Sequence, residues 1–93
     1  MSVTFVVSGP LRELADNRSE IPLDGAPSTV ADALSLLWRA HPAFRDRVIT
    51  ELGALRPHIN IFVDGESIRY SGGFATTVRS GSEIVILPAL SGG

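Results

Sequence analysis

The chain has 93 residues, of which 44% are hydrophobic and 19% charged, a balance typical of one small folded domain. Its net charge of −2 provides no cationic field for phosphates, so nucleic acid is not expected as a partner. It has no cysteine, which excludes disulfides and thiolate chemistry, and its eight basic residues are all arginine, so it cannot carry lysine-linked chains of itself.

No segment predicts export or membrane insertion. The first nine residues lack the basic region of a signal peptide and turn polar early. No apolar run approaches the roughly 20 residues that a membrane helix needs. We therefore expect no membrane partner and a cytoplasmic location.

The amino-terminal part of the sequence predicts two strands. Val3 to Val7 is apolar and β-branched, and the turn signal Gly9-Pro10 follows it. After a loop through Ala15 to Arg18, the segment Ser19 to Leu23 alternates between polar and apolar residues. That alternation, together with its proline, favours a short edge strand.

A helix is predicted from Val30 to the residues before Pro42, since proline disfavours helix just ahead of it. Thr29, with Asp32 three residues later, resembles a capping box with Asp in place of Glu. Apolar residues then recur at helical spacing: Val30, Ala33, Leu34, Leu37 and Trp38. Beyond this helix, residues 44–55 can form a further helical turn or an ordered loop, and the sequence leaves both open.

The last third predicts a hairpin and a final strand. His58 to Val63 alternates, and Asp64-Gly65 supplies a hairpin turn into a strand over Ser67 to Tyr70. Glu83 to Leu87 is a last apolar strand that Pro88 ends. The element order predicts an α+β fold with a mixed five-stranded sheet and one main helix.

The chain ends in a tail of small residues, 88–93, which we expect to be flexible and which closes on Gly92-Gly93. Glycine has no Cβ, so such a tail can lie extended in a narrow channel and present a bare carboxylate. Attack of that carboxylate on the α-phosphorus of ATP would give an acyl-adenylate. At a glycine frequency of about 7%, roughly one chain in 200 ends this way by chance, so the tail alone assigns no function.

Strand order and tail together make the chain resemble the MoaD/ThiS family of ubiquitin-like sulfur carriers over essentially all 93 residues. The densest match runs from Val78 through Gly81-Ser82-Glu83, the apolar strand and Pro88 to Gly92-Gly93. Ser82 stands where the family usually has aspartate. Residues 60–66 and 69–76 are most similar to the carrier of a cysteine-biosynthesis branch, because molybdopterin-synthase small subunits usually have a shorter, less glycine-rich segment here.

This resemblance implies a single β-grasp domain over residues 1–93 that is a carrier and not an enzyme. A separate ubiquitin-activating-like adenylyltransferase would use ATP to activate Gly93, beside Gly92, and sulfur would be loaded as a thiocarboxylate. The carrier itself would bind no cofactor. The acceptor would be a pyridoxal-phosphate-dependent cysteine synthase holding an aminoacrylate, with a metalloprotease releasing cysteine, or the large subunit of molybdopterin synthase. A ubiquitin-like protein modifier and a plain interaction module remain open alternatives.

Strand parity predicts the surface that meets these partners. In the hairpin strand Ile59, Ile61 and Val63 face the helix, which leaves Phe62 on the open face of the sheet. The same reasoning places Ile84 and Ile86 inside. An exposed apolar patch on a small domain is typical of an interaction site. The residues predicted to bind partners are Val6, Phe62, Val85, Leu87 and, in the tail, Leu90.

Other polar signals predict no chemistry. Gly72-Gly73 is interpreted as a simple turn, because no Lys-Ser/Thr follows it. His41 and His58 lack a third ligand at metal spacing, so no metal site is expected. Asp64 and Glu66 straddle the hairpin turn, and we expect them to be turn and surface residues, since nothing places them in a cleft.

Overall fold

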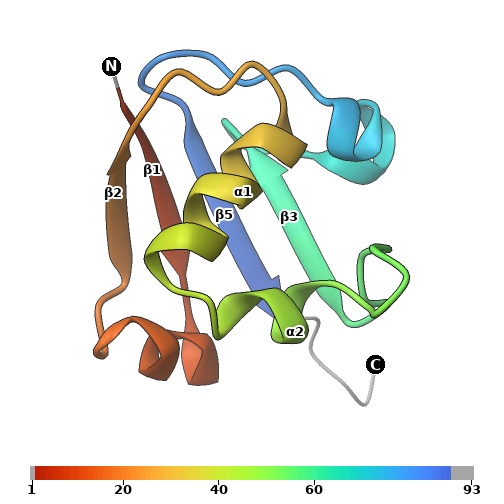
Figure 1. Cartoon of the computed structure of the whole chain (residues 1–93). Helices are drawn as coiled ribbons and strands as arrows, with labels where there is room; N and C mark the ends of the chain where they lie inside the picture. Colours follow the sequence, from red (N-terminus) through yellow and green to blue (C-terminus); the bar gives the residue numbers. More distant parts are fainter. Residues whose placement is uncertain (1, 89–93) are drawn as a thin grey trace.

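Five strands form one mixed sheet in the computed structural model, which describes residues 2–88 (Figure 1). The sheet has the order β2-β1-β5-β3-β4. β1 pairs antiparallel with β2 and parallel with β5, and β3 pairs antiparallel with both β5 and β4. The strands are β1 (Ser2–Val7), β2 (Glu20–Asp24), β3 (Ile59–Val63), β4 (Glu66–Ser67) and β5 (Glu83–Pro88). The predicted mixed five-stranded sheet is confirmed.

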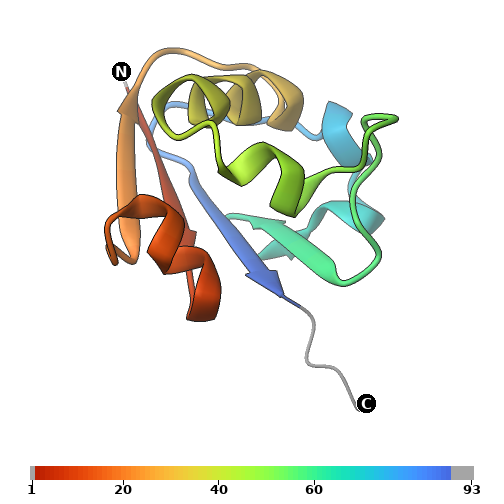
Figure 2. The same ribbon diagram turned by 60° about the horizontal axis from the view of Figure 1, so that its bottom comes forward.

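The sheet has one buried and one open face, because apolar residues alternate along its central strands. Every second residue of β1 and β3 is buried, and so are Ile84 and Ile86 of β5. Both α-helices cover this inner face and lie on the same side of the sheet (Figures 1 and 2). The largest fully buried side chains in this core include Phe5, Phe44, Leu37, Ile61 and Ile84. Within residues 2–88, no α-helix covers the opposite face of the sheet (Figures 1 and 2).

α1 (Val30–Ala40) follows the predicted bounds, because its capping signals are local in sequence. Thr29 is the N-cap, and its hydroxyl accepts a hydrogen bond from the Asp32 amide at 3.2 Å. In a full capping box the side chain of Asp32 would accept from the Thr29 amide. Here the Asp32 carboxylate accepts from the Ser28 hydroxyl instead, at 3.2 Å. His41 is the C-cap, directly before Pro42.

The open question over residues 44–55 has a mixed answer. α2 (Phe44–Val48) is helical, and its two terminal apolar residues are buried. Leu52, the next residue at helical spacing, is 95% exposed. The helix stops because Thr50 organises a tight loop, with its hydroxyl accepting from the amides of Leu52 and Ala54. Residues 49–55 are therefore an ordered loop.

The predicted hairpin is confirmed, but its second strand is shorter than expected. Asp64 and Gly65 both have positive φ, 49° and 88°, as a two-residue type I′ turn requires. β4 ends at Ser67, so the expectation of a strand over Ser67 to Tyr70 was wrong beyond its first residue. The 3₁₀ turn η2 (Ile68–Tyr70) replaces it, because Ile68 turns into the core and is 1% exposed.

Two further 3₁₀ segments were not predicted. η1 (Gly9–Ala15) occupies most of the stretch between β1 and β2 and buries Leu11 and Ala15 (Figure 2). η3 (Gly73–Ala75) begins at the second residue of the glycine pair that was interpreted as a simple turn. Across residues 2–88, no helix has the length and apolar character needed to cross a bilayer.

Candidate functional site

The strand that carries the tail lies in the middle of the sheet. β5 pairs with β1 on one side and β3 on the other, and Ile84 and Ile86 are 0% exposed. Its last residue, Pro88, lies opposite Ile59. A strand paired on both edges and buried on one face is held rigidly, so the tail begins from a fixed point. Leu90, Gly92 and Gly93, the tail residues predicted from the sequence, lie outside the described residues.

The register brings three of the predicted contact residues into one row. Val6 lies opposite Val85 in the β1–β5 pair, and Val85 lies opposite Phe62 in the β3–β5 pair. All three are half-buried on the open face of the sheet. Leu87 lies two residues beyond Val85 on the same face, opposite Asn60, and is also half-buried. We call Val6, Phe62, Val85 and Leu87 the outer row, and the parity prediction for them is confirmed.

Two acidic residues border the outer row, one at its β2 edge and one at the beginning of β5. Glu20 of β2 lies opposite Val6, and Glu83 precedes Val85 by two residues on the same face. Both carboxylates are on exposed residues. The apolar row therefore has an acidic border at the β2 edge and at the beginning of β5. A charged border around an apolar centre is the usual anatomy of a protein interface.

Arg69 forms a set of hydrogen bonds to the beginning of β3, which we call the arginine clasp. The Arg69 guanidinium donates to the carbonyls of Ile59 (3.1 Å) and Pro57 (3.4 Å) and to the Asn60 side-chain oxygen (3.4 Å). These bonds attach η2 to the first residues of β3, which neighbour the end of β5. Arg69 thus stabilises the backbone opposite Pro88, and its guanidinium is committed to that role.

A polar latch holds the beginning of β5 against the hairpin turn. The Ser82 hydroxyl donates to the Asp64 carboxylate at 2.9 Å and accepts from the Arg79 amide at 3.0 Å. The Glu83 amide donates to the other Asp64 oxygen, also at 2.9 Å. Ser82 is only 4% exposed. The departure from the family's usual aspartate therefore has a structural reason, because an aspartate at 82 would face the Asp64 carboxylate.

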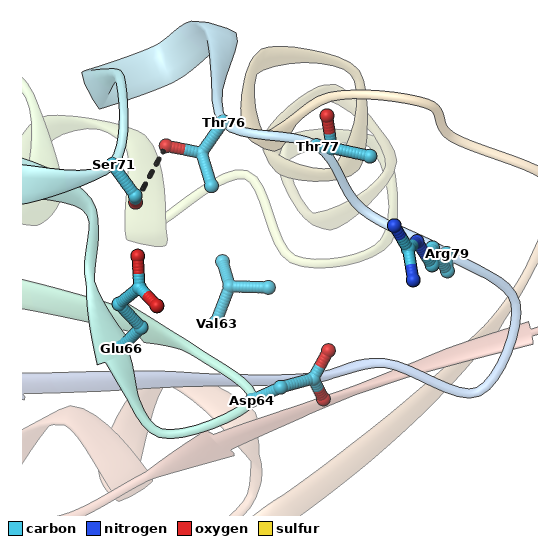
Figure 3. Close-up of a pocket in the computed structure, with 7 residues that line it drawn as sticks. All are labelled: Val63, Asp64, Glu66, Ser71, Thr76, Thr77 and Arg79. Atoms are coloured by element: carbon cyan, nitrogen blue, oxygen red, sulfur yellow. Dashed lines mark hydrogen bonds between the residues drawn. The ribbon is translucent and has the colours of Figure 1, made fainter.

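The same turn lines a cavity that the sequence did not predict. The cavity has a volume of about 280 Å³, and Figure 3 shows the residues that line it. Asp64 and Glu66 are turn and surface residues as expected, but both also line this cavity, and nothing in the sequence placed them there. Its wall combines segments 63–66 and 71–79, which no local pattern connects: Val63, Asp64, Glu66, Ser71, Thr76, Thr77 and Arg79. The cavity lies at the β5 end remote from the tail, and Asp64 is already engaged by the latch.

The two histidines lie apart from any metal-like cluster. Within residues 2–88, no three His, Cys, Asp or Glu side chains are grouped as metal ligands. The His41 ring packs edge-on against Phe44, with ring centroids 6.1 Å apart. His58 precedes β3 and lines a small pocket with Pro88. Sequence reasoning missed this pocket, which lies at the root of the tail.

Comparison with known proteins decides the family. The profile of the ThiS family matches residues 5–93 of the chain. The chain belongs to the MoaD/ThiS family of ubiquitin-like sulfur carriers. This ThiS-family match includes Gly92 and Gly93.

Individual relatives agree with this assignment. Small archaeal modifier protein 1 of Haloferax volcanii is 40% identical over 84 residues, covering 89% of this chain and 91% of that protein. The sulfur carrier protein CysO of Mycobacterium tuberculosis is 30% identical over the full length of both chains. The matching chain in the Amycolatopsis orientalis BexX/CysO complex has a TM-score of 0.85 at 31% identity, covering 98% of this chain and 99% of that one.

These similarities confirm the β-grasp fold and the type of protein. The relatives are named as sulfur carrier and modifier proteins and not as catalysts. The present ThiS-family chain is likewise a small carrier or modifier and not an enzyme.

Proposed function

We propose that this ThiS-family chain carries sulfur on its C-terminal carboxylate. An oxygen of the Gly93 carboxylate attacks the α-phosphorus of ATP, and pyrophosphate leaves. The resulting acyl-adenylate is attacked at its carbonyl carbon by a hydrosulfide-level sulfur nucleophile, and AMP leaves with the bridging oxygen. The product is a thiocarboxylate at Gly93. A separate adenylyltransferase supplies the catalysis by positioning the carboxylate against ATP.

The family match through Gly93 is the observation that carries this proposal. The structure adds a mechanical reason, since the central strand β5 fixes the point from which the tail begins. The tail is small and ends in two glycines, so it can enter a narrow active-site channel. We assign the docking of the activating enzyme to the outer row, and Leu90 of the tail extends that contact.

The cysteine branch is the favoured destination of the sulfur. CysO of Mycobacterium tuberculosis aligns over the full length of both chains. We propose a pyridoxal-phosphate-dependent synthase as acceptor, with the thiocarboxylate sulfur adding to the β-carbon of an enzyme-bound aminoacrylate. The acyl group then moves from sulfur to the amine, and a metalloprotease hydrolyses the new amide. Those steps return the Gly93 carboxylate and release cysteine.

Intact-mass spectrometry of the protein from its native host tests the sulfur-carrier proposal. The expected result is a mass gain equal to the exchange of one oxygen for sulfur, mapped to Gly93. Deletion of Gly92-Gly93 is the matched control, because it leaves residues 2–88 unchanged. If the purified protein forms no acyl-adenylate with any activating enzyme of its host, the carrier proposal is wrong.

A second candidate function is conjugation to other proteins. The 40% identity to small archaeal modifier protein 1 favours it. Carrier and modifier begin with the same adenylate and differ in the nucleophile that follows, sulfur or a lysine amine. Isopeptide-linked adducts of Gly93 on other cellular proteins would identify a modifier. Their absence, together with a thiocarboxylate at Gly93, would identify a carrier.

A further inference from the structure

The root of the tail lies beside a small pocket that the proposed function has not used. The pocket has a volume of about 180 Å³, and its lining comes from four separate parts of the chain: Pro10, Leu11, Arg47, His58, Ile59 and Pro88. Pro88 is the last residue of β5. Its lining is mainly apolar, with a guanidinium and an imidazole as the polar groups.

Because the tail is short, this pocket lies close to any enzyme that acts on the tail. Five residues follow Pro88, and an extended chain of that length spans about 17 Å. An enzyme that holds the Gly93 carboxylate at its catalytic centre therefore has the mouth of its channel within that distance of Pro88. The rim of that mouth then faces the residues around Pro88, and the pocket is among them.

At this end, the guanidinium groups of Arg12 and Arg47 have no partner among the described residues, and of the two Arg47 lines the pocket. Arg45, on the same helix, lies 3.5 Å from Asp46. The Arg56 guanidinium donates to the Asp46 carbonyl at 2.7 Å, and Arg69 is committed to the clasp. Within residues 2–88 the Arg47 guanidinium donates no hydrogen bond and joins no ion pair, and Arg47 is exposed. A carboxylate from outside can therefore bind it without breaking an existing contact in this part of the chain.

Charge is distributed unequally between the two ends of the sheet. The segments at the tail end, 9–20 and 44–59, hold five arginines and five carboxylates. At the other end, residue 24 and segments 64–66 and 79–83 hold four carboxylates and one arginine. The tail end is thus the more positive end of an acidic molecule. Such a distribution favours an encounter in which the tail end approaches an acidic surface.

We propose that this pocket is a socket for the acidic rim of the activating enzyme, which inserts an apolar side chain and pairs a carboxylate with Arg47. This inference rests on the proposed function, because it requires an adenylyltransferase that takes the tail. The apolar lining receives the side chain, and Arg47 fixes its orientation. The socket positions the tail root and does not touch the reacting atoms.

Steady-state adenylation kinetics test the socket, with the adenylyltransferase of the same organism and the full-length carrier as variable substrate. Arg47→Glu is expected to raise the carrier's KM roughly tenfold with kcat unchanged at saturation, because a rim charge acts on association. Arg47→Lys should recover most of the loss. Added salt should raise the KM of the wild type more than that of Arg47→Gln. Circular dichroism of each variant checks the fold.

Two charge-matched controls locate the effect. Arg45→Glu lies on the same helix outside the pocket, and Arg79→Glu lies at the remote end. Both should change KM less than twofold. An equal rise for Arg45→Glu and Arg47→Glu would show general charge steering and overturn the socket, and so would an unchanged KM for Arg47→Glu.

Two further outcomes are distinguishable. A lower KM for Arg47→Glu would show that the guanidinium binds the carrier's own carboxylate, which also overturns the socket. If the wild type forms no adenylate with any host enzyme, the proposed function itself fails, and the socket fails with it.

Discussion

Replacing Phe62 with aspartate separates docking from folding, because Phe62 lies in the outer row while its neighbour Ile61 is in the core. Full burial of a phenylalanine contributes about 1.5–3 kcal/mol, and Phe62 is half-buried, so the variant should lose about 1 kcal/mol of stability. That is small against the roughly 5–15 kcal/mol that holds a domain together. The melting temperature should fall by about 4–8 °C, with the folded circular dichroism spectrum retained.

The effect on activation should be larger than the effect on stability. Phe62 lies beside Val85 in the outer row. A partner that covers the outer row therefore has to desolvate the carboxylate of the Phe62→Asp variant. Loss of a central apolar contact costs about 2 kcal/mol or more at an interface, which corresponds to roughly a 30-fold rise in the carrier's KM for adenylation. ATP–pyrophosphate exchange with varied carrier concentration measures this value.

Ile61→Asp is the matched control on the same strand. Ile61 is 0% exposed, so its replacement buries an unpaired charge and should unfold the domain. An unfolded Phe62→Asp variant would mean that Phe62 belongs to the core. A folded Phe62→Asp variant with a KM within twofold of the wild type would mean that the outer row does not dock the activating enzyme.

Substitutions at three further positions test the structure, each by urea denaturation. Thr29→Ala removes the N-cap hydrogen bond to the Asp32 amide and should lower the free energy of unfolding by about 1 kcal/mol. An unchanged urea midpoint would contradict the capping role of Thr29. Asp64→Ala removes both latch hydrogen bonds and places alanine at φ 49°, so the free energy of unfolding should fall by about 2 kcal/mol. Asp64→Asn should lose less, because asparagine tolerates a positive φ. The free energy of unfolding of Leu52→Gln should stay within about 0.5 kcal/mol of the wild-type value, because Leu52 is 95% exposed. A larger loss of stability would show that the loop around Leu52 packs more tightly than described.

The elements that were predictable are those whose signals are local. α1 has its N-cap at Thr29 and its stop at Pro42, and both lie within a few residues of the helix they bound. The turn at Asp64-Gly65 is likewise encoded by two adjacent residues that accept positive φ. Strand alternation predicted which side chains share the open face, since parity needs no knowledge of the partner strand.

The remaining features depend on contacts between distant parts of the chain. In the sequence Ile68 looks like part of a strand. In the structure its side chain is buried in the core, and the backbone turns into the 3₁₀ segment η2 to place it there. The register that aligns Val6, Val85 and Phe62 exists only once three strands have paired. The socket combines residues as far apart as Pro10 and Pro88, so no spacing rule could have found it.

The central position of β5 also governs when the domain can fold. β5 is the last element among residues 2–88, yet it is the strand that joins β1 to β3 (Figure 1). Until it pairs, the earlier strands have only their hairpin neighbours, β2 and β4, and a short hairpin by itself is at best marginally stable. Closing the sheet therefore needs pairings between the beginning and the end of the chain, which are slow to form. During synthesis the sheet can close only after β5 has left the ribosome, and by then the residues after Pro88 have been translated as well.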